Sequence, residues 1–187
     1  MELGKTLYVT DRKQWRSWLT KNHNAEKEIW LIYYRKSSGK KRIPYNDAVE
    51  EALCYGWIDS ILKGIDKEKF AQRFSPRKPN SVLSQLNKER IHRLIEQKKI
   101  TSDGLNAVKH VFDDSSKNSK YIIKDDILRL LKKDKKTWEN FQKFPESYKR
   151  IRIEWIEGAR TRPELFKKRL KYFLKMTEKN KKYGMMQ

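Results

Sequence analysis

Apolar side chains recur at two spacings along the first third of the chain, and each spacing predicts a different element. Over residues 10–22 they return at helical spacing, and Thr10 is placed to cap that helix. Residues 28–35 are rich in β-branched and aromatic side chains, which predicts a strand. Helical spacing resumes after Asn46, a second capping residue, and Gly56 is placed to end that helix in the left-handed conformation, which glycine adopts without strain.

Two more extended runs, residues 57–63 and 69–75, flank a short turn and predict a β-hairpin. Two prolines follow, and because proline donates no ladder hydrogen bond, they mark a crossover from sheet to helix. We expect Ser81 to open a helix that runs to about residue 98, with five side chains inward: Leu83, Leu86, Ile91, Leu94 and Ile95. A shorter helix follows over residues 103–112. The pattern predicts an α+β domain over residues 1–112, with a small antiparallel sheet.

Residues 113–120 are polar and aperiodic, which predicts a linker. Beyond them, residues 121–187 read as a helical module. We expect helices over about 124–133 and 134–143, a third from Pro145, and a last one from Pro163. The third helix aligns four side chains on one side: Tyr148, Ile151, Trp155 and Ala159. The last helix is expected to bury Phe166, Leu170, Phe173 and Leu174. Its outward face then presents Lys167, Lys168, Lys171 and Lys175. The tail from residue 179 is expected to fray.

Composition predicts a globular cytoplasmic protein. Only 37% of the 187 residues are hydrophobic, but 22 aromatics offset this, since each buried ring removes about 150–250 Å² from water. No apolar run approaches the roughly 20 residues needed to span a bilayer, and the first residues lack a signal-peptide pattern. The lone Cys54 excludes an intramolecular disulfide and fits a reducing compartment.

The net charge of +21 has two interpretations. Lysines outnumber arginines 31 to 14, as AT-rich codon usage would produce on any solvated surface, whereas a polyanion-binding surface favours the bidentate arginine fork. The charge is also spread out: residues 1–80 carry 17 basic and 10 acidic groups, and residues 81–187 carry 28 and 14. Solvated lysines and a polyanion surface therefore stay open as alternatives.

Three blocks resemble one family. EALCYGWID at residues 51–59 is similar to its EALCFGWID signature, and residues 73–87 resemble its RFTPRRPxSxWSxxN stretch; residues 144–159 are similar to its LPPSYRR…WIxxAK helix. The family is that of the OmpD-associated or bacteriocin-protection proteins (YdeI/OmdA-like), and the resemblance spans nearly the whole chain. The sequence departs from the pattern at Leu83, where the family tends to have Trp, and at residues 163–169, where an ETRxxR pattern is usual.

The resemblance implies a bacterial, cytosolic protein linked to stress or to resistance against bacteriocins and antimicrobial peptides. It brings no agreed reaction. It also implies a frataxin-like α+β fold in the N-terminal part, followed by a helical module.

No recognisable catalytic, cofactor or metal motif is present. One cysteine and three isolated histidines, His23, His92 and His110, do not supply a closed zinc site. Phosphate-cradling glycine loops, nucleophile elbows and H-E-x-x-H are absent from the sequence. We interpret Cys54 as a buried, inert thiol, and we expect no catalytic residue, no cofactor and no metal.

One polar cluster predicts a site for a phosphate or carboxylate. Its members lie on the hairpin, the crossover and the start of the following helix: Asp59, Arg73, Arg77, Lys78, Ser81, Ser84 and Asn87. The free N–H groups of a helix start attract anions. The structural alternative is that Arg73 pairs with Asp59 across the hairpin and that Ser81 is only a helix cap. Trp57 and Phe74 are expected in the core rather than as stacking platforms.

Three functions follow. The leading hypothesis is a non-enzymatic binding protein whose basic surface engages a polyanion, nucleic acid being the commonest. The second is an anionic small-molecule site or enzyme centred on Arg73, Arg77 and Ser81. The third is a protein-interaction module that uses the C-terminal helices. Basic side chains clustered on one face would favour the polyanion-binding protein. A cleft at the arginines would favour the small-molecule site, and an exposed apolar groove would favour the protein-interaction module.

Overall fold

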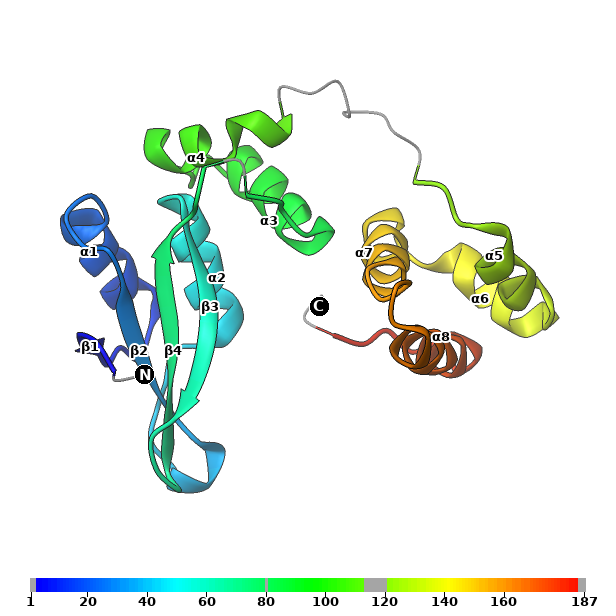
Figure 1. The fold of residues 1–187 in the computed structure, drawn as a ribbon, viewed down its shortest axis with the longest axis horizontal. Coiled ribbons are helices and arrows are strands. Elements are labelled where there is room, and N and C mark those ends of the chain that lie inside the picture. The colour runs from blue at the N-terminus through cyan, green and yellow to red at the C-terminus, as the bar shows by residue number, and fades with distance from the viewer. Residues whose placement is uncertain (1–2, 80, 113–120, 185–187) are drawn as a thin grey trace. The chain divides into compact units, whose positions relative to one another are not determined.

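The computed structural model describes residues 3–79, 81–112 and 121–184. The chain divides into two compact units, residues 1–117 and 118–187 (Figure 1), and each has its own hydrophobic core. The predicted linker at residues 113–120 and the last three residues lie outside the described residues. No described helix is both long enough and apolar enough to cross a membrane.

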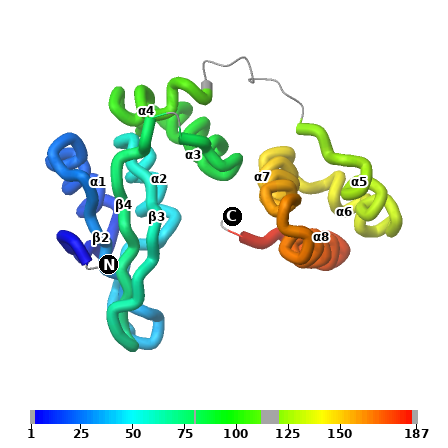
Figure 2. Tube along the Cα trace, viewed as in Figure 1, coloured from blue at the N-terminus to red at the C-terminus, as the bar shows by residue number. Residues whose placement is uncertain are grey.

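The N-terminal unit is a four-stranded sheet with helices packed on it. Its elements in chain order are β1 (Thr6–Leu7), α1 (Arg12–Asn22), β2 (Ile29–Tyr34), a 3-10 turn η1 (Lys36–Ser38), α2 (Tyr45–Cys54), β3 (Trp57–Gly64), β4 (Lys69–Pro76), α3 (Gln85–Glu96) and α4 (Ser102–Phe112). The strand order is β1-β2-β4-β3, and the long β3–β4 hairpin is the clearest feature of this unit in Figure 2.

The α+β class is confirmed, and the sheet is mixed. Strand β4 pairs antiparallel with both β2 and β3, as a hairpin pattern predicts, but β1 runs parallel to β2. The expectation of a purely antiparallel sheet missed β1, because a strand of two residues carries no periodicity.

Aromatic rings fill the core between the sheet and the helices. Trp15 of α1 stacks on Trp18 at 5.3 Å and meets Phe74 of β4 edge-on at 5.5 Å. The Trp15 indole N–H donates to the carbonyl of Ala48 at 2.9 Å, so its polar atom is satisfied although the side chain is fully buried. Trp57 and Phe74 are buried, as predicted.

Three helices of this unit begin at other residues than we expected. Asp11, not Thr10, caps α1, its carboxylate accepting from the backbone N–H of Gln14 at 2.9 Å. Helix α2 begins before Asn46, directly after a proline. Helix α3 begins after Ser84, whose hydroxyl caps it, and not at Ser81. In each case a neighbouring residue supplies the cap or fixes the backbone angle just as well.

Helix α2 ends where α4 approaches it most closely. Gly56 follows α2 with a φ of 72°, the left-handed conformation predicted for it. A Cβ on Gly104 of α4 would lie 2.2 Å from the carbonyl oxygen of Cys54, and Thr101 donates its hydroxyl to that same oxygen at 2.7 Å. Glycine is therefore required at position 104 by the contact between the two helices.

The C-terminal unit consists of four described helices, α5 (Asp125–Lys132), α6 (Lys135–Lys143), α7 (Glu146–Glu157) and α8 (Pro163–Glu178). Their inner faces share a core that includes Ile127, Leu131, Phe141, Tyr148, Ile156, Leu170 and Phe173. The helical content of this part is confirmed. In the segment we expected to fray, the ring of Tyr183 lies 4.7 Å from that of Tyr172, and its backbone N–H donates to the Tyr148 hydroxyl at 3.2 Å.

Candidate functional site

The structure separates Asp59 from Arg73. Asp59 lies opposite Phe74 on the neighbouring strand, so Arg73 points to the other face of the sheet. Arg73 instead donates its Nε to Glu28 at 2.7 Å, and this hydrogen bond lowers the pKa of the Glu28 carboxyl. The alternative in which Arg73 pairs with Asp59 is therefore wrong. Asp59 accepts a hydrogen bond from the Tyr45 hydroxyl at 2.5 Å.

Arg77 and Ser81 do come together. A terminal nitrogen of the Arg77 guanidinium donates to the Ser81 hydroxyl at 2.9 Å and to the Val82 carbonyl at 3.1 Å. Burial lowers the pKa of Arg77, and no carboxylate of a described residue pairs with it. Lys78 is exposed beside it. Arg77 thus holds the crossover segment in place.

Ser84 and Asn87 belong to the start of α3. The Ser84 hydroxyl accepts from the Asn87 backbone N–H at 3.3 Å, and the Asn87 side-chain oxygen accepts from Arg90 at 2.9 Å. The seven predicted residues therefore do not form one site. Arg73 lies on the other face of the sheet from Asp59, and Ser81 lies ahead of the helix that Ser84 caps. Arg90 and Tyr45 contact two of these residues, yet neither gave a sequence signal, since their contacts form only when α2, α3 and β3 pack together.

Cys54 is fully buried, and burial raises the pKa of its thiol to about 11. This agrees with the interpretation of an inert thiol. Within the described residues, no group of three or more His, Cys, Asp and Glu side chains is arranged to hold a metal ion. His23 pairs with Asp103 at 2.8 Å, and His110 contacts the Ser81 carbonyl at 3.2 Å.

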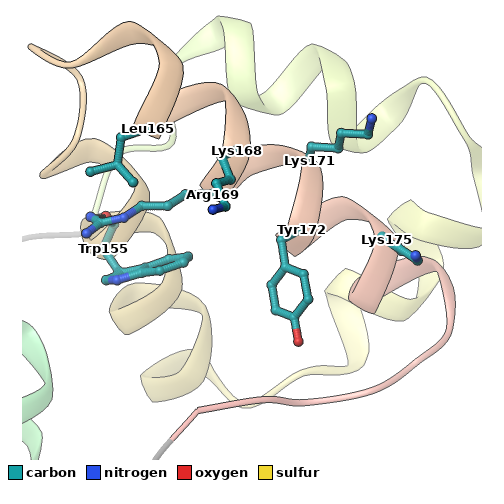
Figure 3. A pocket seen from close by; sticks show the side chains of 7 residues that line it. All are labelled: Trp155, Leu165, Lys168, Arg169, Lys171, Tyr172 and Lys175. Atoms are coloured by element: carbon teal, nitrogen blue, oxygen red, sulfur yellow. Dashed lines mark hydrogen bonds between the residues drawn. The ribbon is translucent and has the colours of Figure 1, made fainter.

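A groove of about 550 Å³ runs along α8 and contains three of the four predicted surface lysines. Figure 3 shows its lining: Trp155, Leu165, Lys168, Arg169, Lys171, Tyr172 and Lys175. Lys168, Lys171 and Lys175 share it because spacings of three and four residues place them on one side of a helix. Lys167 does not line the groove and pairs with Glu164 at 3.2 Å. We call this site the α8 groove.

Two aromatic rings form part of its wall. Trp155 is 36% exposed and Tyr172 46% exposed, which is unusual for side chains of this size. The Arg169 guanidinium lies 4.4 Å over the Trp155 ring and donates to the Trp155 carbonyl. Trp155 was expected on one side of its helix with Tyr148, Ile151 and Ala159; these three are buried, but Trp155 forms part of the surface, where Arg169 lies over its ring.

The groove lysines, Lys168, Lys171 and Lys175, lack a carboxylate partner among the residues that the structure describes. Residues 121–187 carry 20 basic and 9 acidic side chains, so the surrounding charge is positive as well. Cations around a groove with low-dielectric walls concentrate a positive potential inside it.

Residues 7–107, more than half of the chain, match the family model described as a domain of unknown function, DUF8412. The chain belongs to the DUF8412 family. Residues 120–180 match a second model, described as "Bacteriocin-protection, YdeI or OmpD-Associated". The expected resemblance therefore holds for the C-terminal part and does not span nearly the whole chain, because the blocks at 51–59 and 73–87 fall within the DUF8412 match.

Comparison with curated proteins and with solved structures gave no match. The α8 groove lies entirely within the bacteriocin-protection match, and the Arg77–Ser81 contact lies within the DUF8412 match.

Proposed function

We propose that this DUF8412 protein is a non-enzymatic cytoplasmic binding protein that engages single-stranded nucleic acid in the α8 groove. The observation that carries the proposal is that one groove combines exposed aromatic rings with lysines that pair with no carboxylate of the described residues. Proteins that bind single strands without sequence preference use this combination: cations follow the backbone, and bases stack on rings. Because the C-terminal part matches a bacteriocin-protection model, we place this binding in stress or antimicrobial-peptide resistance.

Stacking is supported by the way the rings are presented. Tyr172 extends from α8 into the groove in Figure 3, and the Arg169 guanidinium lies over the Trp155 ring. Bases stack on guanidinium planes as well as on aromatic rings, so the Arg169–Trp155 pair offers a second platform. A stacked base contributes about 1–3 kcal/mol of binding free energy.

The lining argues against an amphipathic protein helix as the occupant. Grooves for such helices are lined by aliphatic and methionine side chains. Here Leu165 is the one aliphatic residue among the lining residues, and the remaining apolar surface comes from aromatic rings and lysine stems.

The test is a binding titration of the full chain with a fluorescently labelled single-stranded oligonucleotide at several salt concentrations. We expect weak, sequence-indifferent binding, with Kd on the order of 10⁻⁴–10⁻⁶ M at physiological salt, that falls steeply as salt rises. Binding that does not change with salt, or no binding at low salt, would remove the proposal.

The lysines are tested by the triple variant Lys168→Ala, Lys171→Ala and Lys175→Ala. If each contacts one phosphate, the slope of log K against log salt should fall by about 2, since each phosphate in a single strand contributes about 0.7. The matched control removes three exposed lysines of the same unit, Lys133, Lys135 and Lys136. An equal loss in both variants would mean that only the overall charge matters.

The stacking contribution is tested with Tyr172→Ala against Tyr172→Phe. The alanine variant should bind roughly tenfold more weakly, which corresponds to one stacked base, while the phenylalanine variant keeps the ring and should bind normally. If an acidic helical peptide binds the wild-type chain and the oligonucleotide does not, the protein-interaction alternative is correct.

We also propose that residues 113–120 link two separable units. A polar segment of this composition is a preferred site of proteolysis, so limited digestion should cut there first. The salt-dependent oligonucleotide binding should then remain with the C-terminal fragment. First cleavage within residues 80–98 would place the boundary elsewhere.

A small anion at Arg77 is a second candidate, because the half-buried guanidinium has no carboxylate partner among the described residues. If it binds an anion, phosphate should raise the melting temperature of the wild-type chain and not that of Arg77→Gln. If phosphate raises the melting temperature of the wild type and of Arg77→Gln equally, the anion binds at other cations.

A further inference from the structure

One end of the sheet in the N-terminal unit is not covered by helices α1 and α2. Strands β3 and β4 extend beyond these helices in Figure 1, and the β3–β4 turn lies at the same end as the segment that joins β2 to α2. The Arg35 backbone N–H donates to the Glu68 carbonyl at 2.7 Å, which joins that segment to the turn. We call this end of the unit, residues 35–42 and 61–69, the sheet tip.

Three aliphatic side chains of the sheet tip are exposed within five residues of each other. Leu62 is 60% exposed, Ile61 is 44% exposed and Ile65 is 36% exposed. Aliphatic side chains that are exposed singly are normal on a protein surface, whereas a group of them is typical of an interaction surface.

The sheet tip is also strongly basic. Its two segments carry eight basic and two acidic side chains. Both carboxylates already have partners: Asp66 accepts two backbone N–H groups of its own turn, and Glu68 lies 3.9 Å from Lys40. The exposed cations that pair with no carboxylate of the described residues are Arg35, Lys36, Lys41, Arg42 and Lys67.

Cations and aliphatic side chains share one face of the sheet tip. The Arg42 guanidinium lies 5.9 Å over the ring of Phe70 in β4. Phe70 and Gln72 are two residues apart on β4 and therefore lie on one face of the sheet, and Leu62 lies opposite Gln72. A surface that buries aliphatic side chains and pairs its cations with anions at the same time fits the boundary of an anionic lipid bilayer.

Two other partners fit this surface less well. A second copy could add its own strand to the edge of β3, but the pairing of β3 is interrupted by a bulge between Asp59 and Leu62, and two copies of the same tip would bring like charges together. A nucleic acid stacks its bases on rings, and none of the three exposed aliphatic side chains carries one.

We propose that the sheet tip docks on anionic lipid bilayers. Ile61, Leu62 and Ile65 enter the headgroup region, and the surrounding cations contact lipid phosphates. This surface belongs to the N-terminal unit and is independent of nucleic-acid binding in the α8 groove.

The first experiment is co-sedimentation of the full chain with vesicles of phosphatidylcholine alone and with increasing shares of phosphatidylglycerol. Binding should be weak to phosphatidylcholine, should rise steeply with the anionic lipid and should fall as salt is added. No binding to vesicles rich in phosphatidylglycerol, or equal binding to both lipids, would overturn the proposal.

The second experiment removes the aliphatic side chains with the double variant Ile61→Thr and Leu62→Thr, since threonine suits a strand. Vesicle binding should weaken about tenfold, while oligonucleotide binding and the melting temperature should stay those of the wild type. The matched control is Ile95→Gln with Leu105→Gln, which removes two exposed aliphatic side chains from helices of the same unit and should bind vesicles normally.

Equal vesicle binding by the threonine variant and the wild type would show that these side chains do not enter the bilayer. If sedimentation velocity instead shows that the wild type is a dimer and the threonine variant a monomer, and neither binds vesicles, the surface pairs with a second copy. Either result would make the proposal wrong.

The third experiment removes cations of the sheet tip with Lys36→Ala, Lys41→Ala and Lys67→Ala. Binding to vesicles rich in phosphatidylglycerol should weaken roughly 100-fold, because each lysine near an anionic membrane adds about fivefold. The control removes three exposed lysines from elsewhere in the unit, Lys13, Lys21 and Lys27, and should lose much less. An equal loss in both variants would mean that the net charge alone attracts the chain, and the sheet tip would not be the docking surface.

Discussion

Helices α1 and α8 are both basic, but they use their cations in opposite ways. Arg12 of α1 donates to Glu51 at 2.8 Å and to Glu50 at 2.9 Å, and Arg16 pairs with the other oxygen of Glu51 at 2.7 Å. The groove lysines of α8 have no such partners among the described residues. The first set of cations joins two helices, and the second is available to a ligand.

The difference changes how the net charge of +21 is interpreted. The excess of lysine over arginine suggested solvated surface charge, because polyanion sites favour arginine. In this molecule, arginines 12, 16, 73, 93 and 160 form ion pairs within the units. Lysines such as Lys124, Lys149 and Lys167 also pair with carboxylates, whereas the three groove lysines have no such partner among the described residues. Each residue type therefore includes paired and unpaired cations, and the lysine-to-arginine ratio says little about binding.

The largest effect is expected where the cations hold the fold. Arg12→Ala should lower the free energy of unfolding by about 2–3 kcal/mol, because it leaves the 5%-exposed Glu51 with one partner fewer. Urea denaturation at neutral pH measures this. Lys13→Ala, exposed on the same helix, is the control and should change stability by less than about 0.5 kcal/mol. Equal effects would mean that the α1–α2 ion pairs contribute nothing.

A smaller effect is expected at Arg73, whose ion pair with Glu28 is partly exposed. Arg73→Ala should destabilise the chain by about 0.5–1 kcal/mol at neutral pH. Because Arg73 lowers the pKa of Glu28 in the folded state, the pair contributes fully above the unfolded pKa and is lost as pH falls through the folded pKa. The difference in unfolding free energy between the wild type and Arg73→Ala should be constant from about pH 6 to 8 and should shrink below about pH 4. A difference in unfolding free energy that grows as the pH falls would contradict this dependence on the Glu28 carboxylate.

The smallest stability effect is expected in α8. Replacing Lys168, Lys171 and Lys175 by alanine should leave the free energy of unfolding within about 0.5 kcal/mol, since alanine favours helices and no ion pair with a described residue is lost. Urea denaturation of this variant checks it. A large loss of stability would show that these lysines support the fold and are not reserved for a ligand.

The elements could be predicted from the sequence because each depends on local spacing. The hairpin of β3 and β4, the end of α2 at Gly56 and the buried face of α8 follow from alternation, glycine geometry and helical periodicity. The exact helix starts could not be predicted, because two residues near each start can cap the helix equally well. Asp11 competes with Thr10 at α1, and Ser84 competes with Ser81 at α3.

The candidate sites were predicted only in part. The groove lysines were found because they share one side of a single helix. Trp155 was grouped with residues that are buried, since periodicity alone does not tell which edge of a helix stays exposed. The partners of Arg73 and Arg90 come from segments far away in the sequence, Glu28 in one case and Asn46 in the other. Such pairs depend on how the elements pack, which local patterns do not encode.

The buried thiol of Cys54 makes the chain suited to site-specific labelling. With its pKa near 11, only about one thiol in a thousand is ionised at mildly alkaline pH, and the side chain is fully buried. A cysteine introduced at exposed Lys168 would therefore be the one thiol that reacts readily with maleimide dyes, with the native residue left in place. A fluorophore attached there would report directly on the occupancy of the groove.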